Sequence, residues 1–204
     1  MDATELIKMG NMMDIAGRSH FNLEKKVREM FDFLSNFGFS EVESSPTLIR
    51  YQNGDIEVDI YHGRQSYEIG AGITVSGTRY SISEIIQASD SELFEQFRYA
   101  MTSTPEGVAK ALEELSVLMK RYGNAALEGD QQFITVLEKQ REQCVEKLAL
   151  DSLAYQLRPK ASEAFRQKDY STAADLYSRI RNCLSAAELK KLSFAIKHSK
   201  TAQS

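Results

Sequence analysis

The feature that most constrains this fold is a change of hydrophobic period after Gly38, from helical spacing to alternation. The segment "TLIRYQNGDIEVDIYH", residues 47–62, contains two runs separated by Asn53-Gly54, a residue pair that strongly favours a tight hairpin turn. In the second run apolar and acidic residues alternate: Ile56, Val58 and Ile60 against Glu57 and Asp59. Because successive side chains of a strand point to opposite faces, the segment predicts two antiparallel strands with one apolar and one polar face.

The next segment, "SYEIGAGITV", residues 66–75, alternates in the same way and predicts a third strand of the same meander. A short edge strand is expected over residues 39–43. Gly70 and Gly72 fall on the polar face of the third strand, where a backbone or a bulky side chain can approach closely. We interpret this space as admitting a helix or relieving a bend, and a ligand groove is the alternative.

The segments on either side of the alternating region have helical spacing. Residues 22–36 place apolar side chains at steps of three and four, with Asn22 as the expected N-cap and Gly38 as the stop. Residues 3–15 predict a shorter helix. The apolar face of the sheet must be covered, and helix 22–36 is the expected cover.

From Ser81 onward the chain reads as helical, with Ser83 opening a short helix and Thr104 capping a longer one that begins at Pro105. That longer helix carries a heptad-like seam suited to either an intrachain hairpin or a dimer: Val108, Leu112, Leu115, Met119 and Tyr122. Residues 131–157 form the longest periodic segment and are expected to pair antiparallel with residues 105–122. The sequence therefore predicts an α+β fold. An N-terminal helix packs on a three- to four-stranded antiparallel meander in residues 1–90, and an all-helical region with antiparallel long helices occupies residues 91–204.

The last part of the helical region contains "ASEAFRQKDYSTAADLYSRI", residues 161–180. Its small and aromatic residues recur at fixed intervals: Ala161, Phe165, Asp169, Tyr170, Ala173 and Tyr177. Over residues 160–184 this spacing resembles a tetratricopeptide-type helical hairpin. The closing proline is missing after Ile180, and only one repeat is visible, whereas solenoids usually need at least about three repeats. We therefore expect the hairpin to pack on the long helices.

The formal charge of −4 over 204 residues conceals an asymmetry along the chain. Residues 1–104 carry nine Lys and Arg against sixteen Asp and Glu, a net −7, while residues 105–204 carry sixteen against thirteen, a net +3. An acidic first half disfavours binding of a phosphate backbone by that half.

The N-terminal residues lack a readable secretory signal, and the chain lacks a long apolar run, so the expected location is cytoplasmic without membrane contact. Cys144 and Cys183 are expected to be reduced.

The polar stretch "DIYHGRQSYEIG", residues 59–70, most resembles a functional site. Glu57, Asp59 and Glu68 share the polar phase of their strands, and carboxylates gathered in this way are suited to a divalent metal. The matching nuclease signature requires a lysine after the second acidic residue, but no lysine occurs between Lys26 and Lys110. We therefore expect a solvated acidic face with no metal and no cofactor.

A catalytic histidine is the other enzymatic interpretation of this stretch. Ser66, His62 and Asp59 contain the atoms of a hydrolytic triad, yet within one hairpin alternate positions face opposite ways. The sequence also contains no nucleophile elbow and no phosphate-binding glycine loop. His62 is expected to be a turn residue, and a hydrolase centred on His62 and Asp59 ranks last among the hypotheses.

The segment from Arg158 to Lys200 is basic, with ten basic and four acidic residues. Eight of its cations form a candidate surface for nucleic acid: Arg158, Lys160, Arg166, Lys168, Arg179, Arg181, Lys190 and Lys191. Their helical spacing fits the solvent face of packed helices equally well. Both interpretations stay open at this stage.

The arrangement of residues 23–88, a helix followed by the meander and "YSISEII", resembles small bacterial α/β proteins of the immunity and conflict-system type. In these proteins the last strand carries an Arg-Ser-x-Glu-like segment, represented here by Arg64, Ser66 and Glu68. The resemblance implies a non-enzymatic protein that binds another macromolecule. The leading hypothesis is an inhibitor, immunity-type or adaptor protein whose acidic face binds a basic protein through Glu57, Asp59, Tyr61, Arg64, Tyr67 and Glu68. The alternative is an accessory subunit of a nucleic-acid-acting defence or repair complex, and a second copy of this chain is a further candidate partner.

Overall fold

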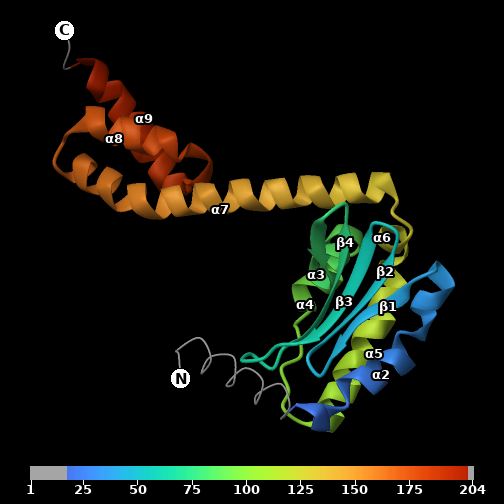
Figure 1. Ribbon diagram of the computed structural model, residues 1–204. Coiled ribbons are helices and arrows are strands. Elements are labelled where there is room, and N and C mark those ends of the chain that lie inside the picture. Colours follow the sequence, from blue (N-terminus) through green and yellow to red (C-terminus); the bar gives the residue numbers. More distant parts are fainter. Residues whose placement is uncertain (1–17, 202–204) are drawn as a thin grey trace, which may run out of the picture. The chain divides into compact units, whose positions relative to one another are not determined.

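The structure is a computed structural model that describes residues 18–201 (Figure 1). The expected helix over residues 3–15 lies outside the described residues. The chain divides into two compact units, one ending at Glu138 and the other beginning at Lys139. This boundary differs from the expected one near residue 90, because the helices that follow the sheet pack on its apolar face and so belong to the same unit.

The first unit is built on an antiparallel sheet with strands in the order β1-β2-β3-β4-β5. The strands are β1 (Ser40–Ser45), β2 (Leu48–Asn53), β3 (Ile56–His62), β4 (Ile69–Val75) and β5 (Thr78–Ser81). The α+β class, the meander and the hairpin at Asn53-Gly54 are confirmed. The sheet has five strands instead of three or four. The additional strand, β5, has four residues and follows a turn in which Ser76 and Gly77 both have positive φ.

The helix expected over residues 22–36 is divided in two. Helix α2 (Leu23–Met30) ends at Phe31, and the 3-10 helix η2 (Asp32–Phe37) follows. Gly38 ends η2 with a left-handed φ of 79°, a conformation that glycine adopts without steric cost. Asn22 occupies the N-cap position, but its side chain accepts no capping hydrogen bond. A shorter 3-10 helix, η1, precedes it (Ser19–Phe21).

The remaining helices of the first unit follow the sheet in the chain. They are α3 (Ile82–Ser89), α4 (Ser91–Gln96), α5 (Pro105–Tyr122) and α6 (Asn124–Leu127). Thr104 caps α5 by accepting a hydrogen bond from the Gly107 N–H at 3.1 Å, as expected. Helix α3 begins earlier than expected, because Ser81 and Glu84 form a reciprocal capping box at its N-terminus. 

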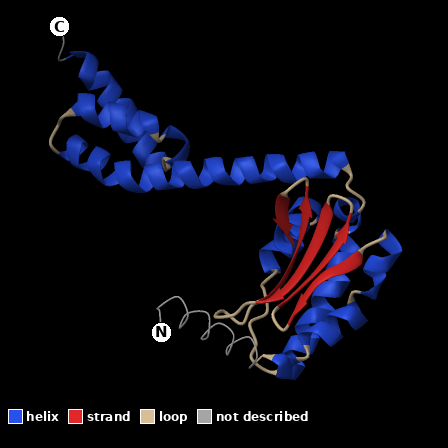
Figure 2. Cartoon of the chain, in the orientation of Figure 1, coloured by secondary structure: helices blue, strands red, loops and turns tan. Residues whose placement is uncertain are grey.

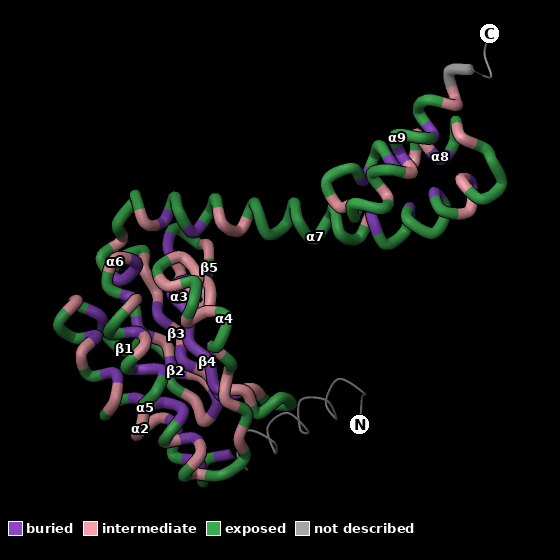
Figure 3. Tube along the Cα trace, turned by 180° about the vertical axis from the view of Figure 1, so that it is seen from behind, coloured by how far each residue is buried: buried purple, intermediate pink, exposed green. Residues whose placement is uncertain are grey.

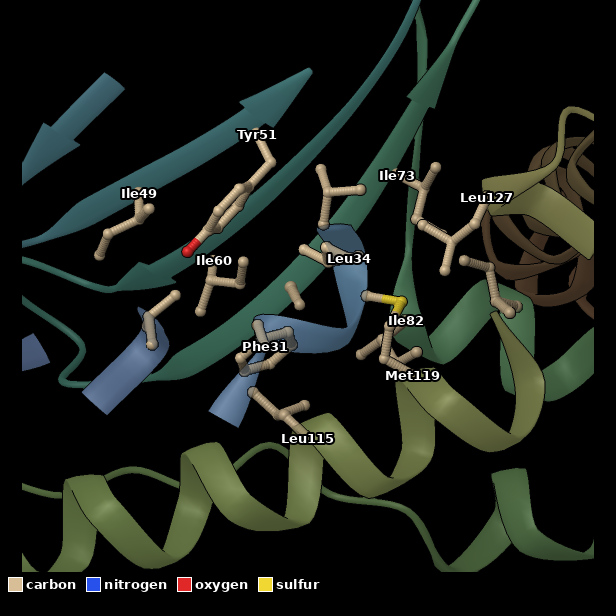
Figure 4. Close-up of a cluster of buried hydrophobic side chains, with 14 of the residues drawn as sticks. Phe31, Leu34, Ile49, Tyr51, Ile60, Ile73, Ile82, Leu115, Met119 and Leu127 are labelled. Carbon is tan, nitrogen blue, oxygen red and sulfur yellow. The ribbon is translucent and has the colours of Figure 1, made fainter. Parts of the chain in front are cut away.

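The helices of this unit gather on one side of the sheet (Figure 2). Side chains of alternate strand positions point from the sheet toward α2 and α5 in the close-up of the core (Figure 4). Ile49, Val58, Ile60 and Ile73 are all fully buried in this layer. The seam expected on α5 lies in the same core, where Val108, Leu112, Leu115 and Met119 are buried. The seam therefore serves packing within the chain.

The second unit contains most of α7 (Gln131–Arg166), then α8 (Tyr170–Arg179), the 3-10 helix η3 (Arg181–Cys183) and α9 (Ala186–Thr201). Helix α7 begins in the first unit, where Ile134 and Leu137 are buried, and continues through Pro159. The expected pairing of residues 105–122 with 131–157 extends across the boundary at Glu138, so neither unit describes it and it stays a prediction. 

Small side chains hold the helices of the second unit together. Its main cluster joins the end of α7, α8 and α9 through Ala161, Ala164, Ala173, Tyr177, Leu192 and Ala195. Tube colouring by burial shows that buried residues in this unit are separated by exposed ones along each helix (Figure 3).

Cys144 and Cys183 are both free thiols. None of the helices described between residues 18 and 201 has both the length and the apolar character needed to span a membrane.

Candidate functional site

The polar side chains of the sheet lie on the face turned away from the helices, which we call the open face. On this face Asp59 of β3 lies opposite Gly72 of β4, and Tyr61 lies opposite Gly70. Its charged and aromatic residues come from four of the strands, β1, β2, β3 and β5, and from the residue before β4: Glu43, Arg50, Glu57, Asp59, Tyr61, Glu68 and Arg79. The alternation read from the sequence therefore brings residues from five segments onto one surface.

Gly70 and Gly72 make room for two of these side chains. A Cβ at Gly70 would lie about 2.5 Å from Cζ of Tyr61, and a Cβ at Gly72 about 2.5 Å from Cζ of Arg79. Real side chains do not tolerate contacts this short, so both glycines are needed for Tyr61 and Arg79 to lie flat against β4. The space expected to admit a helix, relieve a bend or hold a ligand is filled by side chains of the open face itself.

Tyr61 and Arg79 are held by carboxylates on the same face. Arg79 donates to both carboxylate oxygens of Asp59, at 2.8 and 2.7 Å, and its guanidinium lies 5.6 Å from the centre of the Tyr61 ring. The Tyr61 hydroxyl donates to Glu68 at 2.6 Å. Burial and this hydrogen bond raise the pKa of Tyr61, and the hydrogen bond from Arg79 to Asp59 raises the pKa of Arg79. The phenol and the guanidinium therefore keep their protons across the physiological range.

Arg50 organises the other side of the open face. It donates to Glu43 at 2.7 Å and lies 3.5 Å from Glu57. Both carboxylates remain accessible, with side chains 46% and 40% exposed, whereas the Asp59 side chain is only 13% exposed. Four carboxylates and two guanidinium groups give the open face a formal charge of −2. The face is acidic, but it is a network of ion pairs and not the row of solvated carboxylates expected from the sequence.

The β3–β4 hairpin carries the other two predicted residues, Arg64 and Tyr67. Tyr67 has a positive φ of 54° and donates its N–H to the Gly63 carbonyl at 3.0 Å. Arg18, which is only 4% exposed, donates to the carbonyls of Gly63 and Arg64, and its guanidinium lies 4.5 Å from the Tyr67 ring centre. The hairpin is therefore fixed by a buried cation that lies more than forty residues away in the chain. The Arg64 side chain is exposed.

His62 is buried instead of lying in the turn. It is the last residue of β3, is 1% exposed, and its Nε2 lies 3.0 Å from the Thr102 carbonyl oxygen. Phe21 packs edge-on against its ring at 4.9 Å, and its Nδ1 has no hydrogen-bond partner among the described residues. Burial lowers the pKa of His62. Because Asp59 points to the open face and His62 to the buried one, the two side chains do not form a catalytic pair.

Sequence reasoning placed four of its six candidate residues on the open face, namely Glu57, Asp59, Tyr61 and Glu68. It missed Arg50 and Arg79, which neutralise part of the charge, and Arg18, which anchors the hairpin. The alternating pattern of β2 puts Arg50 on the polar face, so that signal was available. The position of Arg79 on the open face could be predicted only by recognising the short strand β5. No local pattern in the sequence identifies Arg18 as a partner of Gly63.

The eight basic candidates of the second unit have different environments. Arg158 donates to Glu188 at 2.9 Å and to the Cys183 carbonyl at 2.6 Å, and Arg166 pairs with Glu163. Lys191 lies 5.8 Å from the ring centre of Phe165. The other five side chains are exposed: Lys160, Lys168, Arg179, Arg181 and Lys190.

The described residues contain no group of three or more His, Cys, Asp or Glu side chains arranged to hold a metal ion. Comparisons of the chain with protein family models, with curated proteins and with solved structures found no match.

Proposed function

We propose that this protein is a non-enzymatic binding protein whose open face and β3–β4 hairpin bind a basic partner protein, as an inhibitor or adaptor would. The observation that carries the proposal is the layer formed by Tyr61 and Arg79 lying flat over Gly70 and Gly72, with carboxylates around it. The helices of the first unit gather on the other side of the sheet (Figure 2).

Contacts within the chain already hold the central side chains of the open face in place. Bidentate pairing with Asp59 fixes Arg79, and the hydrogen bond to Glu68 fixes Tyr61. Side chains that are already immobilised lose little conformational entropy on binding, which is a large cost in most protein complexes. Tyrosine and arginine are also the residue types that most often dominate binding energy at interfaces.

The charge of the open face supports a basic partner. The excess of carboxylates attracts a positively charged protein and speeds the encounter. Glu43 and Glu57 are more accessible than Asp59, and both pair with the cation Arg50. They are therefore expected to contribute most to long-range attraction, while Tyr61 and Arg79 form the contact.

Affinity capture with the full chain tests this proposal, using the double variant Glu43→Lys, Glu57→Lys. A surface ion pair contributes roughly 0–1 kcal/mol, so this variant should remain folded, as circular dichroism would verify. We expect a basic protein captured by the wild-type chain from extracts of the source cells to be lost from the variant. The association rate measured with that purified protein should fall at least about tenfold and should depend steeply on salt in the wild type.

The control reverses the same number of charges on α4, where Glu92 and Glu95 are exposed. The variant Glu92→Lys, Glu95→Lys should capture the partner at the wild-type level. Equal capture by both double variants, or partners that carry no positive surface, would refute the proposal.

A further inference from the structure

The second unit carries a cluster of aromatic rings on its surface. Phe165 comes from the end of α7, Tyr170 from the start of α8, and Phe194 and His198 from α9. Their ring centres are 5.4–5.8 Å apart for Phe165, Tyr170 and Phe194, and Phe194 stacks on His198 at 3.9 Å. His198 Nδ1 donates to the Phe194 carbonyl at 2.8 Å, which holds the imidazole parallel to the phenyl ring. The three helices meet in Figure 1, in orange to red.

The rings of this aromatic cluster are only partly buried. Phe194 is 44% exposed, and Phe165, Tyr170 and His198 are only partly buried, whereas the alanines beneath them are buried. A fully packed cluster would hide phenyl rings more completely, because each ring contributes a large apolar area. Phe194 and His198 cover one face of each other, and the part of the cluster that remains exposed is open to a further flat group.

A groove beside the cluster adds positive charge. Its volume is about 540 Å³, and it is lined by Pro159, Ser162, Glu163, Phe165, Arg166 and Lys191. Glu163 is paired with Arg166 and also accepts a hydrogen bond from Gln167, so its charge is compensated locally. Lys191 lies over the Phe165 ring, with its Nζ 5.8 Å from the ring centre. Between residues 139 and 199 the unit carries twelve Lys and Arg against seven Asp and Glu, a net +5.

We propose that this aromatic and basic surface binds single-stranded nucleic acid, with bases stacked on Phe194, His198 and Tyr170 and phosphates held by Lys191 and the neighbouring cations. Stacking platforms combined with a positive groove are the usual means of single-strand recognition, because every base has an aromatic face. A duplex keeps its bases paired inside the double helix, so they cannot stack on these aromatic rings. An acidic peptide would match the positive charge of the groove, but its carboxylate side chains have no aromatic face to stack on the rings. The site lies in the second unit and is independent of the function proposed for the open face.

Binding of labelled oligothymidylate and oligouridylate strands to the full chain, followed by fluorescence anisotropy, tests the proposal. We expect binding that weakens steeply with salt and that is stronger than binding to a duplex of the same length. Phe194→Ala should weaken it about tenfold, the loss typical of one stacked base, while Phe194→Tyr should restore it. Lys191→Gln should weaken binding and reduce its salt dependence.

Two matched variants serve as controls. Tyr155 is 83% exposed on α7, ten residues before Phe165, and Tyr155→Ala should bind like the wild type. Arg179 is exposed at the opposite end of α8 from Tyr170, and Arg179→Gln should have a smaller effect than Lys191→Gln. 

Three results would overturn the proposal. They are no binding at low salt, equal binding by wild type and Phe194→Ala when both are folded by circular dichroism, and displacement of the strand by polyglutamate as effectively as by unlabelled oligonucleotide. The last result would indicate a surface for acidic proteins. 

Discussion

His62 and Asp59 lie three residues apart in β3, but their surroundings give them opposite properties. Asp59 lies on the open face and accepts two hydrogen bonds from the guanidinium of Arg79. His62 is enclosed by Phe21 and Tyr67, and this burial, together with the nearby cation Arg18, lowers the pKa of the ring although the hydrogen bond to the Thr102 carbonyl acts in the opposite direction. At this scale, burial and the nearest charged neighbour determine what a side chain can do.

The surroundings of His62 predict a loss of stability in mild acid. The unfolded chain takes up a proton near the ordinary pKa of 6.5, whereas the folded chain takes it up only at lower pH. The stability contributed by the neutral ring is therefore complete above about pH 6.5 and is lost as the pH falls below that value. The free energy of unfolding in urea should decrease between pH 7.5 and 5.5, by about 1.4 kcal/mol for each unit of pKa difference at most.

The variant His62→Gln removes the titrating group and should show a smaller decrease over the same pH interval, whatever its stability at pH 7.5. The same decrease in the variant and in the wild type would mean that other groups cause the effect.

At the scale of secondary structure elements, the turns and caps of this chain are fixed by local hydrogen bonds. The capping box of α3 is an example, because it joins β5 directly to the helix that covers the sheet. The Glu84 N–H donates to Ser81 Oγ at 3.3 Å, and the Ser81 N–H donates to Glu84 Oε2 at 2.8 Å. Two N–H groups that the helix leaves unpaired are satisfied in this way.

Removing the cap should therefore destabilise the first unit. We expect Ser81→Ala to lower the free energy of unfolding by about 0.5–2 kcal/mol, measured by urea denaturation followed by circular dichroism. Ser89→Ala is the matched control, since Ser89 is exposed in the last turn of the same helix. Its effect should stay within about 0.5 kcal/mol. Similar losses in the two variants would show that the cap is unimportant for stability.

At the scale of the whole molecule, the two units differ in how they are stabilised. The core of the first unit contains large apolar residues from the sheet and from its helices, among them Phe31, Ile60, Ile85 and Leu112. The main cluster of the second unit consists largely of alanines, with Tyr177 and Leu192 as its larger members. Because stabilisation grows with the apolar area buried, the second unit gains less from packing.

This difference predicts unequal protection from hydrogen exchange in the full chain. Amides of β3 and β4 should exchange most slowly, and amides of α8 and α9 should exchange markedly faster, as measured by mass spectrometry of peptides. Protection of α8 and α9 equal to that of the central strands would contradict the difference in packing described above.

The sequence by itself determined the meander and its polarity. Alternation in residues 47–75 and the turn at Asn53-Gly54 act between neighbours in the chain, and they were sufficient to place Glu57, Asp59 and Tyr61 on one face. Gly38, Thr104 and Pro105 marked helix ends correctly for the same reason, since each acts through its own backbone or the next turn.

The tertiary structure alone decided which groups neutralise one another and where the first unit ends. The pairing of Arg79 with Asp59 depends on β5, a strand of only four residues whose local pattern is too short to identify. Arg18 reaches the carbonyl of Gly63 across forty-five positions, and the burial of His62 depends on Phe21 and Thr102 from distant segments. Helices α4, α5 and α6, which follow residue 90, belong to the first unit because the apolar face of the sheet must be covered. Such contacts depend on the packing of distant segments, which local spacing in a sequence does not encode.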